Sequence, residues 1–137
     1  MALTHLVDTS VLTRLKEAAV RAALEPLTAD GRVARAGISD LEIGFSARSA
    51  REWDSLQEAL DSFGLVETDA NHLRRARQVQ MLLAARSQRG RKIPDLLVAA
   101  AAEEAGLAIL HYDADFDRIA AVTGQACEWV VPAGSID

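Results

Sequence analysis

The sequence predicts an α/β protein in which a short parallel sheet is covered by helices on both faces. Three observations lead to this prediction. Short apolar runs alternate with longer segments of helical periodicity, the pattern of parallel strands joined by helical crossovers. Half of the 137 residues are apolar but only 4% are aromatic, which is typical of alanine-rich helical or α/β proteins. Residues 96–102 include no polar side chain, so a helix there should be buried on nearly every side.

Five short apolar runs are the predicted strands. The first lies in "THLVDTS" (4–10) and ends in a polar turn, and the second is "RVARAGIS" (32–39). "LVETD" (65–69) predicts a short edge strand, "LAILHYD" (107–113) a buried one, and "EWVVP" (128–132) the last. In a parallel sheet the crossovers between these strands should be right-handed.

Helical spacing of apolar residues predicts the segments between the strands. These helical segments are 11–20, 21–30, 39–47, 50–64, 70–86, 93–106 and 115–124. Pro26 should mark the start of a helix or a break in one. Ser39 or Asp40 is the expected N-cap of its helix. The helix at 93–106 is the clearest, because Pro94 stands at a favoured first position and Gly106 at the C-terminal stop.

Composition narrows the class of protein. No apolar run has transmembrane length, and "MALTHLVDTSVL" lacks the basic leader and long apolar stretch of a secretory signal. The one cysteine, Cys127, has no partner for an internal disulfide, which fits a reducing cytoplasm. With no repeat or linker in view, we expect a cytoplasmic protein that forms one domain over residues 1–137.

The charge is unevenly distributed. The net charge of −5 counts mildly against nucleic-acid binding. Between positions 71 and 92, however, the chain has no acid and seven bases: Arg74, Arg75, Arg77, Arg86, Arg89, Arg91 and Lys92. Such a strip is most often a solvated helix face, and it could also attract phosphates.

Four carboxylates stand where strands end and helices begin. Asp8 closes one apolar strand and Asp113 follows another, whereas Glu42 and Asp95 are expected in the first turns of helices. In a parallel sheet these positions open onto one edge. Four carboxylates gathered there without a cation would raise one another's pKa values, which predicts a divalent metal site with oxygen ligands. Each acid could instead simply cap a helix or complement its dipole.

Competing motifs are absent. A calcium-binding EF-hand loop starting at Asp113 would need glycine and glutamate where Arg118 and Gly124 stand. A phosphatase of the haloacid dehalogenase type would need a second aspartate where Ser10 stands. Neither a phosphate-binding P-loop nor the nucleophile elbow of serine hydrolases is present. A metal-assisted reaction therefore remains the favoured chemistry.

"LVDTSVL", "SDLEIGFSAR", "IPDLLVAAAAE" and "LHYDADFDRIA", in this order, resemble the PIN-domain ribonucleases, in particular the VapC-type toxins of bacterial toxin–antitoxin pairs. The resemblance implies a three-layer α/β/α fold and an acidic site for Mg²⁺, with Mn²⁺ as a substitute. The family's four catalytic acids fall on Asp8, Glu42, Asp95 and Asp113. Asp115 matches an additional metal-binding acid, so the implied metal ligands are Asp8, Asp95, Asp113 and Asp115. Ser10 matches a position that orients the first aspartate.

The resemblance also implies an activity and partners. The reaction would be hydrolysis of RNA phosphodiester bonds, with Arg86, Arg89, Arg91 and Lys92 as candidate RNA-binding residues. A cognate VapB-type antitoxin would neutralise the enzyme, a homodimer is expected, and operator DNA would be reached only through the antitoxin. His111 departs from the threonine or serine of many relatives, and could either supply a hydrogen bond or pack. Two alternatives remain: an RNA-maturation nuclease without an antitoxin, and a non-catalytic module that binds RNA or protein.

Overall fold

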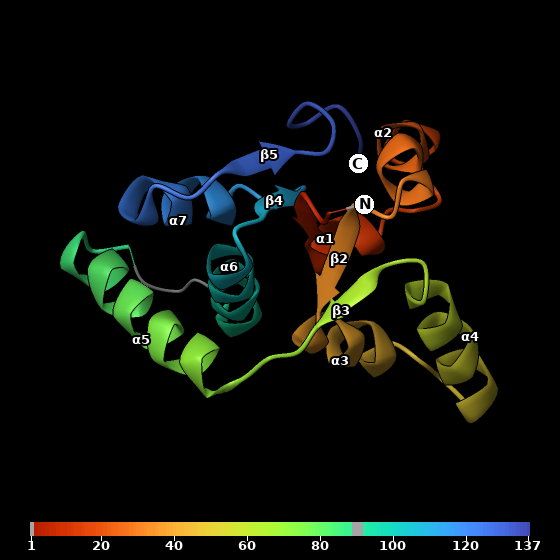
Figure 1. Cartoon of the computed structure of the whole chain (residues 1–137), viewed down its shortest axis with the longest axis horizontal. Helices are drawn as coiled ribbons and strands as arrows, with labels where there is room; N and C mark the ends of the chain where they lie inside the picture. Colours follow the sequence, from red (N-terminus) through yellow and green to blue (C-terminus); the bar gives the residue numbers. More distant parts are fainter. Residues whose placement is uncertain (1, 89–91) are drawn as a thin grey trace.

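The computed structural model describes residues 2–88 and 92–137, and its centre is a five-stranded parallel sheet (Figure 1). The strand order is β3-β2-β1-β4-β5. The strands are β1 (His5–Val7), β2 (Val33–Ala36), β3 (Gly64–Val66), β4 (Ala108–His111) and β5 (Cys127–Trp129). All neighbouring strands pair in parallel. The order reverses between β1 and β4, the place where open parallel sheets bind their ligands.

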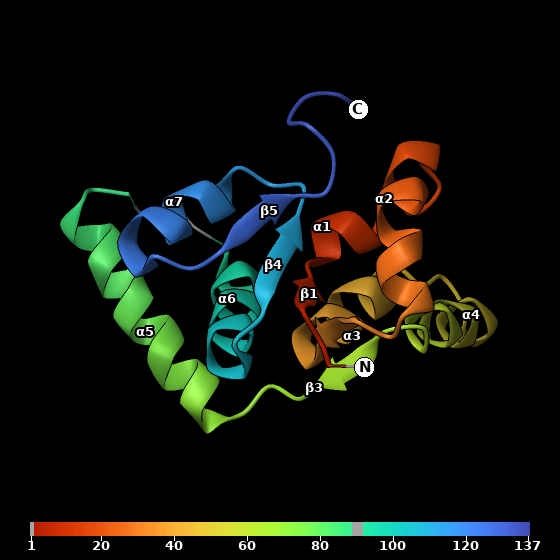
Figure 2. The ribbon, with the colours of Figure 1, turned by 45° about the horizontal axis from the view of Figure 1, so that its top comes forward.

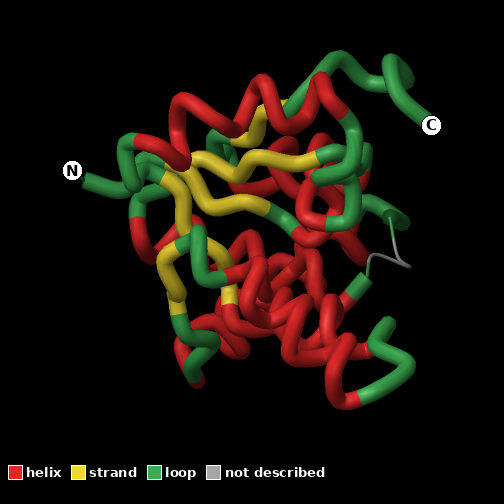
Figure 3. Tube along the Cα trace, turned by 90° about the vertical axis from the view of Figure 1, so that its right-hand side faces the viewer, coloured by secondary structure: helices red, strands yellow, loops and turns green. Residues whose placement is uncertain are grey.

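Helices cover both faces of the sheet, as the alternating pattern predicts (Figures 2 and 3). They are α1 (Thr9–Leu12), α2 (Ala18–Ala29), α3 (Gly37–Phe45), α4 (Ala50–Leu60), α5 (Ala70–Ala85), α6 (Ile93–Ala105) and α7 (Asp115–Thr123). Successive strand residues point to opposite faces. Thus Leu6 and Ile109 pack in an apolar cluster with α5, α6 and α7, whereas Val7 and Leu110 pack in a second cluster with α1, α2 and α4. The predicted α/β/α architecture is confirmed.

Helix α6 is the buried helix that the sequence predicts. All its side chains from Leu96 to Ala102 are buried. Pro94 lies in the first turn, and Gly106 ends the helix in the left-handed conformation with φ 70°. None of the helices among the described residues is long and apolar enough to cross a membrane.

The prediction for Pro26 was wrong. This residue lies inside α2, which runs on to Ala29 instead of starting or breaking there. Proline removes one backbone hydrogen bond, and near the C-terminal end of a helix that loss affects a single turn. The Thr28 hydroxyl donates to the Leu24 carbonyl oxygen at 2.8 Å, an additional hydrogen bond near the end of this helix.

The start of α3 was also predicted wrongly. The N-cap is Ala36, so Ser39 and Asp40 lie inside the first turns and neither of them caps the helix. Glu42 consequently lies in the second turn and not in the first. The cause is tertiary, because Asp40 is held by an arginine of β2.

That arginine, Arg35, is buried at the junction of three elements. Its Nε donates to Asp40 Oδ1 at 2.7 Å and its Nη2 to Asp40 Oδ2 at 3.2 Å. Its Nη1 donates to the carbonyl oxygens of Leu60, at 3.0 Å, and Phe63. One guanidinium thereby ties β2 to α3 and to the connection between α4 and β3.

Candidate active site

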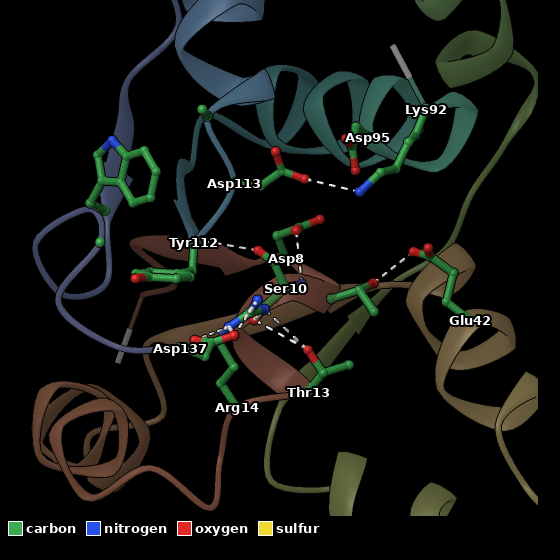
Figure 4. A pocket seen from close by; sticks show the side chains of 14 residues that line it. Asp8, Ser10, Thr13, Arg14, Glu42, Lys92, Asp95, Tyr112, Asp113 and Asp137 are labelled. Carbon is green, nitrogen blue, oxygen red and sulfur yellow. Dashed lines mark hydrogen bonds and ion pairs between the residues drawn. The ribbon is translucent and has the colours of Figure 1, made fainter. Parts of the chain in front are cut away.

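A cavity of about 570 Å³ opens at the carboxyl ends of β1 and β4, where the strand order reverses (Figure 4). The side chains that line it include six of the predicted site residues: Asp8, Ser10, Glu42, Lys92, Asp95 and Asp113. The expectation that four acids, remote in sequence, meet at one edge of the sheet is therefore confirmed.

Asp8 caps a helix with one carboxylate oxygen, and its other oxygen is not used in the cap. It follows β1 directly and caps α1, because its Oδ2 accepts the backbone N–H of Ser10 at 2.9 Å. Its Oδ1 is buried and has no hydrogen-bond partner among the described residues. Burial raises the pKa of this carboxyl and outweighs the opposing hydrogen bonds from Ser10. The capping alternative is thus correct for one oxygen and leaves the other unexplained.

Asp95 is a second strongly perturbed acid of the cavity. It lies in the first turn of α6, is 5% exposed, and has a buried Oδ2 without a hydrogen-bond partner among the described residues. Burial first, and then repulsion from Asp8 and Asp113, raise the pKa of Asp95 from 3.8 to about 8. A bound cation would remove this cost by neutralising the carboxylates.

Asp95, Asp113 and Asp115 form a cluster able to hold a metal ion. Each offers one carboxylate oxygen, and the three oxygens lie within 4.8 Å of one another. Asp113 is oriented by its own turn, because its Oδ1 accepts the backbone N–H of Asp115 at 2.9 Å. Asp8 stands outside this set of three, although its charge contributes to the raised pKa of Asp95. An all-carboxylate donor set suits a hard divalent cation, so the residues present fit such an ion.

Glu42 is held by a residue that the sequence did not single out. The hydroxyl of Thr9 donates to Glu42 Oε1 at 2.7 Å and lies 2.8 Å from the hydroxyl oxygen of Ser39, which is fully buried. In the sequence, Thr9 is marked only by its position directly after Asp8. In the structure it is the first residue of α1, and its side chain reaches Glu42 of α3. Glu42 is therefore positioned from α1 as well as from its own helix.

Of the predicted basic strip between positions 71 and 92, one described residue lines the cavity and others lie away from it. Lys92 reaches the cavity, where its Nζ lies 3.3 Å from Asp113 Oδ2 and the pKa of the ammonium is raised by that charge. Arg86 is exposed at the end of α5 and is not among the cavity-lining residues. Arg89 and Arg91 lie outside the described residues. Farther along, Arg75 is paired with Glu103 of α6 at 2.6 Å, a structural contact.

His111 combines both of the roles considered for it. Its Nδ1 accepts the backbone N–H of Asp113 at 3.2 Å, which fixes the turn that carries this acid. The ring also packs, with its centroid 5.0 Å from the rings of both Phe116 and Trp129. Burial lowers the pKa of the imidazole. The neutral form, which can accept at Nδ1, is therefore favoured.

Another group of cavity residues escaped the sequence analysis. Arg14, Tyr112 and Asp137 line the cavity on the side of Asp8 away from Lys92 (Figure 4). They come from three distant parts of the chain. No local pattern connects them, so only the folded structure could reveal the group.

The raised pKa of Asp95 predicts how stability depends on pH in the metal-free protein. Between pH 4 and pH 8 the unfolded chain ionises Asp95 whereas the folded chain keeps it protonated, so the free energy of unfolding should fall as pH rises and level off above about pH 8. Each pKa unit corresponds to about 1.4 kcal/mol, so the fall should amount to a few kcal/mol.

Urea unfolding with a chelator, measured from pH 5 to pH 9, checks this expectation. Asp95→Asn should flatten the curve, and Asp54→Asn, at an exposed acid on α4, should leave it unchanged. Added Mg²⁺ should stabilise the unsubstituted protein more at pH 8 than at pH 5. Equal slopes for Asp95→Asn and the unsubstituted protein would contradict the assignment of the raised pKa to Asp95.

Comparisons with known proteins cover the same elements. The family model described as the PIN domain matches residues 5–122. Ribonuclease VapC51 of Mycobacterium tuberculosis is 65% identical over 137 residues, which make up 100% of both chains. Ribonuclease VapC21 of the same organism is 44% identical, covering 98% of this chain and 99% of its own. A solved DNA-bound VapBC from Salmonella typhimurium superposes with a TM-score of 0.79 at 18% identity, covering 94% of this chain and 99% of the matched one.

Proposed function

The chain belongs to the PIN-domain family, and we propose that it is a metal-dependent endoribonuclease that acts as the toxin of a toxin–antitoxin pair. One observation of the site carries the proposal. Two buried carboxylate oxygens, Asp8 Oδ1 and Asp95 Oδ2, have no hydrogen-bond partner among the described residues although their side chains line one cavity. Buried carboxyl groups with unpartnered oxygens are costly to ionise unless a cation binds them. The relatives named ribonucleases support RNA as the substrate.

The proposed ion is Mg²⁺, with Mn²⁺ as a substitute, held by Asp8, Asp95, Asp113 and Asp115. When bound, such an ion supplies the positive charge that activates a water molecule and stabilises the charge developing on the phosphate. The carboxylate donor set and the raised pKa of Asp95 support this assignment.

The other side chains of the site orient these groups. Ser10 holds Asp8 through its backbone N–H, while its hydroxyl accepts the backbone N–H of Tyr112 at 2.9 Å and so joins α1 to the residue that follows β4. Glu42 completes the catalytic acids from α3, fixed by Thr9. Lys92 sits at the rim and offers an ammonium to the RNA backbone, at the cost of its pairing with Asp113.

The proposed partner is a VapB-type antitoxin, which would carry the complex to operator DNA. Solved neighbours of this fold include a DNA-bound VapBC, which supports the assignment. The proposed location is the cytoplasm, and the proposed unit is one PIN domain over residues 1–137.

A homodimer is proposed through the outer face of α3. On this helix Phe45 is 92% exposed and Leu41 is 71% exposed. Large apolar side chains that lie open to water on one helix are typical of a protein interface. Phe45→Ser should convert the purified protein from dimer to monomer in light scattering at micromolar concentration. Met81→Ser, at an exposed site on α5, is the matched control and should leave the mass unchanged. A dimer that survives Phe45→Ser would exclude this face.

The test of the activity is cleavage of total cellular RNA by the purified protein, followed by sequencing of the new ends. Cleavage should require Mg²⁺, stop with a chelator, and occur at few positions. Protein that is folded and binds Mg²⁺ but cuts no RNA would favour a non-catalytic binding module. Copurification of a small DNA-binding protein encoded beside it would distinguish a toxin from a maturation nuclease.

A further inference from the structure

Arg14 is a basic residue of the cavity that the proposed reaction does not yet use. It lies between α1 and α2, on the side of Asp8 away from Lys92 (Figure 4). Its Nη1 donates to the Ser10 carbonyl oxygen at 2.7 Å, and its Cζ lies 4.9 Å from the centre of the Tyr112 ring. Ser10 and Tyr112 adjoin the strand ends that carry Asp8 and Asp113. The guanidinium is therefore fixed in position relative to the acids.

The remaining edge of this guanidinium holds an anion. Nε lies 3.1 Å from Asp137 Oδ1, and Nη2 lies 3.0 Å from Asp137 Oδ2. This planar contact of two nitrogens with two oxygens is the arrangement by which arginine also binds phosphate. Asp137 thus marks a position that fits an anionic group with two oxygens.

The contact with Asp137 is replaceable. The Asp137 side chain is 54% exposed, and exposed ion pairs contribute little to stability. The segment before it is anchored by Tyr112, whose hydroxyl donates to the Ile136 carbonyl oxygen at 2.6 Å and accepts the Ile136 N–H at 3.2 Å. A phosphate can therefore take the place of the carboxylate without disturbing the core.

We propose that Arg14 binds a phosphate of the RNA beside the acidic cluster, and that Asp137 occupies the same guanidinium when RNA is absent. The inference rests on the proposed ribonuclease function. Among the described residues, Arg14 and Lys92 are the basic side chains that line this otherwise acidic cavity, and they stand on opposite sides of Asp8. An RNA strand that crosses the acidic cluster would therefore contact one basic side chain on each side of it, Lys92 on one side and Arg14 on the other. The C-terminal segment then competes with RNA and sets the affinity for substrate.

The test measures RNA affinity in the full chain with Mg²⁺, by fluorescence anisotropy of a short labelled single-stranded RNA, with KM for cleavage measured in parallel. Arg14→Ala should raise Kd by about tenfold, because it removes a charged hydrogen-bonding partner. It should also reduce the slope of log Kd against log salt by about 0.7. Asp137→Asn should lower Kd by about two- to fivefold, the contribution expected of an exposed ion pair.

The double variant separates competition from an independent effect. If Asp137 acts by occupying Arg14, Asp137→Asn should change nothing once Arg14 is alanine. Tyr112→Phe keeps a ring beneath the guanidinium but removes both hydrogen bonds to Ile136, so it should lower Kd as Asp137→Asn does. Matched controls are Lys16→Ala, an exposed base close by in the chain, and Asp30→Asn, whose partner Arg32 does not line the cavity.

The outcomes can be told apart. RNA cleavage with an unchanged Kd for Arg14→Ala would overturn this inference and leave the proposed function standing. An effect of Asp137→Asn that persists without Arg14 would overturn the competition. If the unsubstituted protein neither binds nor cuts RNA, the proposed function itself fails. Should Arg14→Ala misfold, Arg14→Lys keeps the charge without the two-point contact, and it should still raise Kd and KM.

Discussion

Asp95→Asn is expected to abolish RNA cleavage, with a fall in kcat of about a thousandfold or more. The substitution removes a charged ligand from the proposed metal site while keeping the shape of the side chain. Losing the transition-state stabilisation that a bound cation supplies costs several kcal/mol, and each 1.4 kcal/mol or so is a factor of ten in rate. The measurement is single-turnover cleavage of a sequenced substrate at saturating Mg²⁺.

Loss of cleavage by Asp95→Asn is informative only if the variant protein is still folded. Asp95→Asn should retain the circular dichroism spectrum of the unsubstituted protein, since neutral asparagine replaces an acid whose ionisation is disfavoured by burial. Asp54→Asn should cleave at the original rate. Full activity in a folded Asp95→Asn protein would exclude Asp95 from the catalytic acids.

Arg35→Ala is expected to lower the free energy of unfolding by about 3–5 kcal/mol, the effect of breaking a buried ion pair by removing one partner. Arg35 is only 9% exposed, and it satisfies Asp40 and two backbone carbonyl oxygens together. Its loss leaves these acceptors without their donor. Equilibrium unfolding in urea at pH 7 measures the change.

Arg48→Ala is the matched control, because Arg48 also pairs with a carboxylate, that of Glu52, at 3.2 Å. Its side chain is 88% exposed. That substitution should alter stability by less than about 1 kcal/mol. Equal losses for Arg35→Ala and Arg48→Ala would show that burial of Arg35 does not matter to the fold.

The sequence predicted the acids of the cavity well because their placement follows from local rules. A carboxylate at the end of an apolar strand, such as Asp8 or Asp113, must lie at one edge of a parallel sheet. Asp95 is equally constrained by the proline and the apolar run of its helix. The edge at which these acids meet was therefore predictable without knowing the strand order.

The errors arose where tertiary contacts decide a local feature. Aspartate is a residue type that is favoured at N-caps, and Asp40 was therefore a candidate. In the structure, Arg35 of the neighbouring strand binds the Asp40 carboxylate, and α3 begins at Gly37. Thr9 gains its role only when α1 and α3 approach. Arg14, Tyr112 and Asp137 come together only when the sheet has formed and the C-terminal segment packs against it. No periodic pattern in the sequence predicts contacts between residues so far apart.

The hydrogen bond from the Tyr112 N–H to the Ser10 hydroxyl joins residues 102 positions apart. Closing so long a loop is entropically unfavourable and slow, so we expect β1 to pair with β4 late in folding. During synthesis the first strand must wait until residues 108–113 have left the ribosome. A nascent chain thus carries Asp8 without Asp95 or Asp113 beside it, and it cannot cut the RNA around it. For an enzyme whose substrate also surrounds its own synthesis, this order of assembly delays the activity until translation is nearly complete.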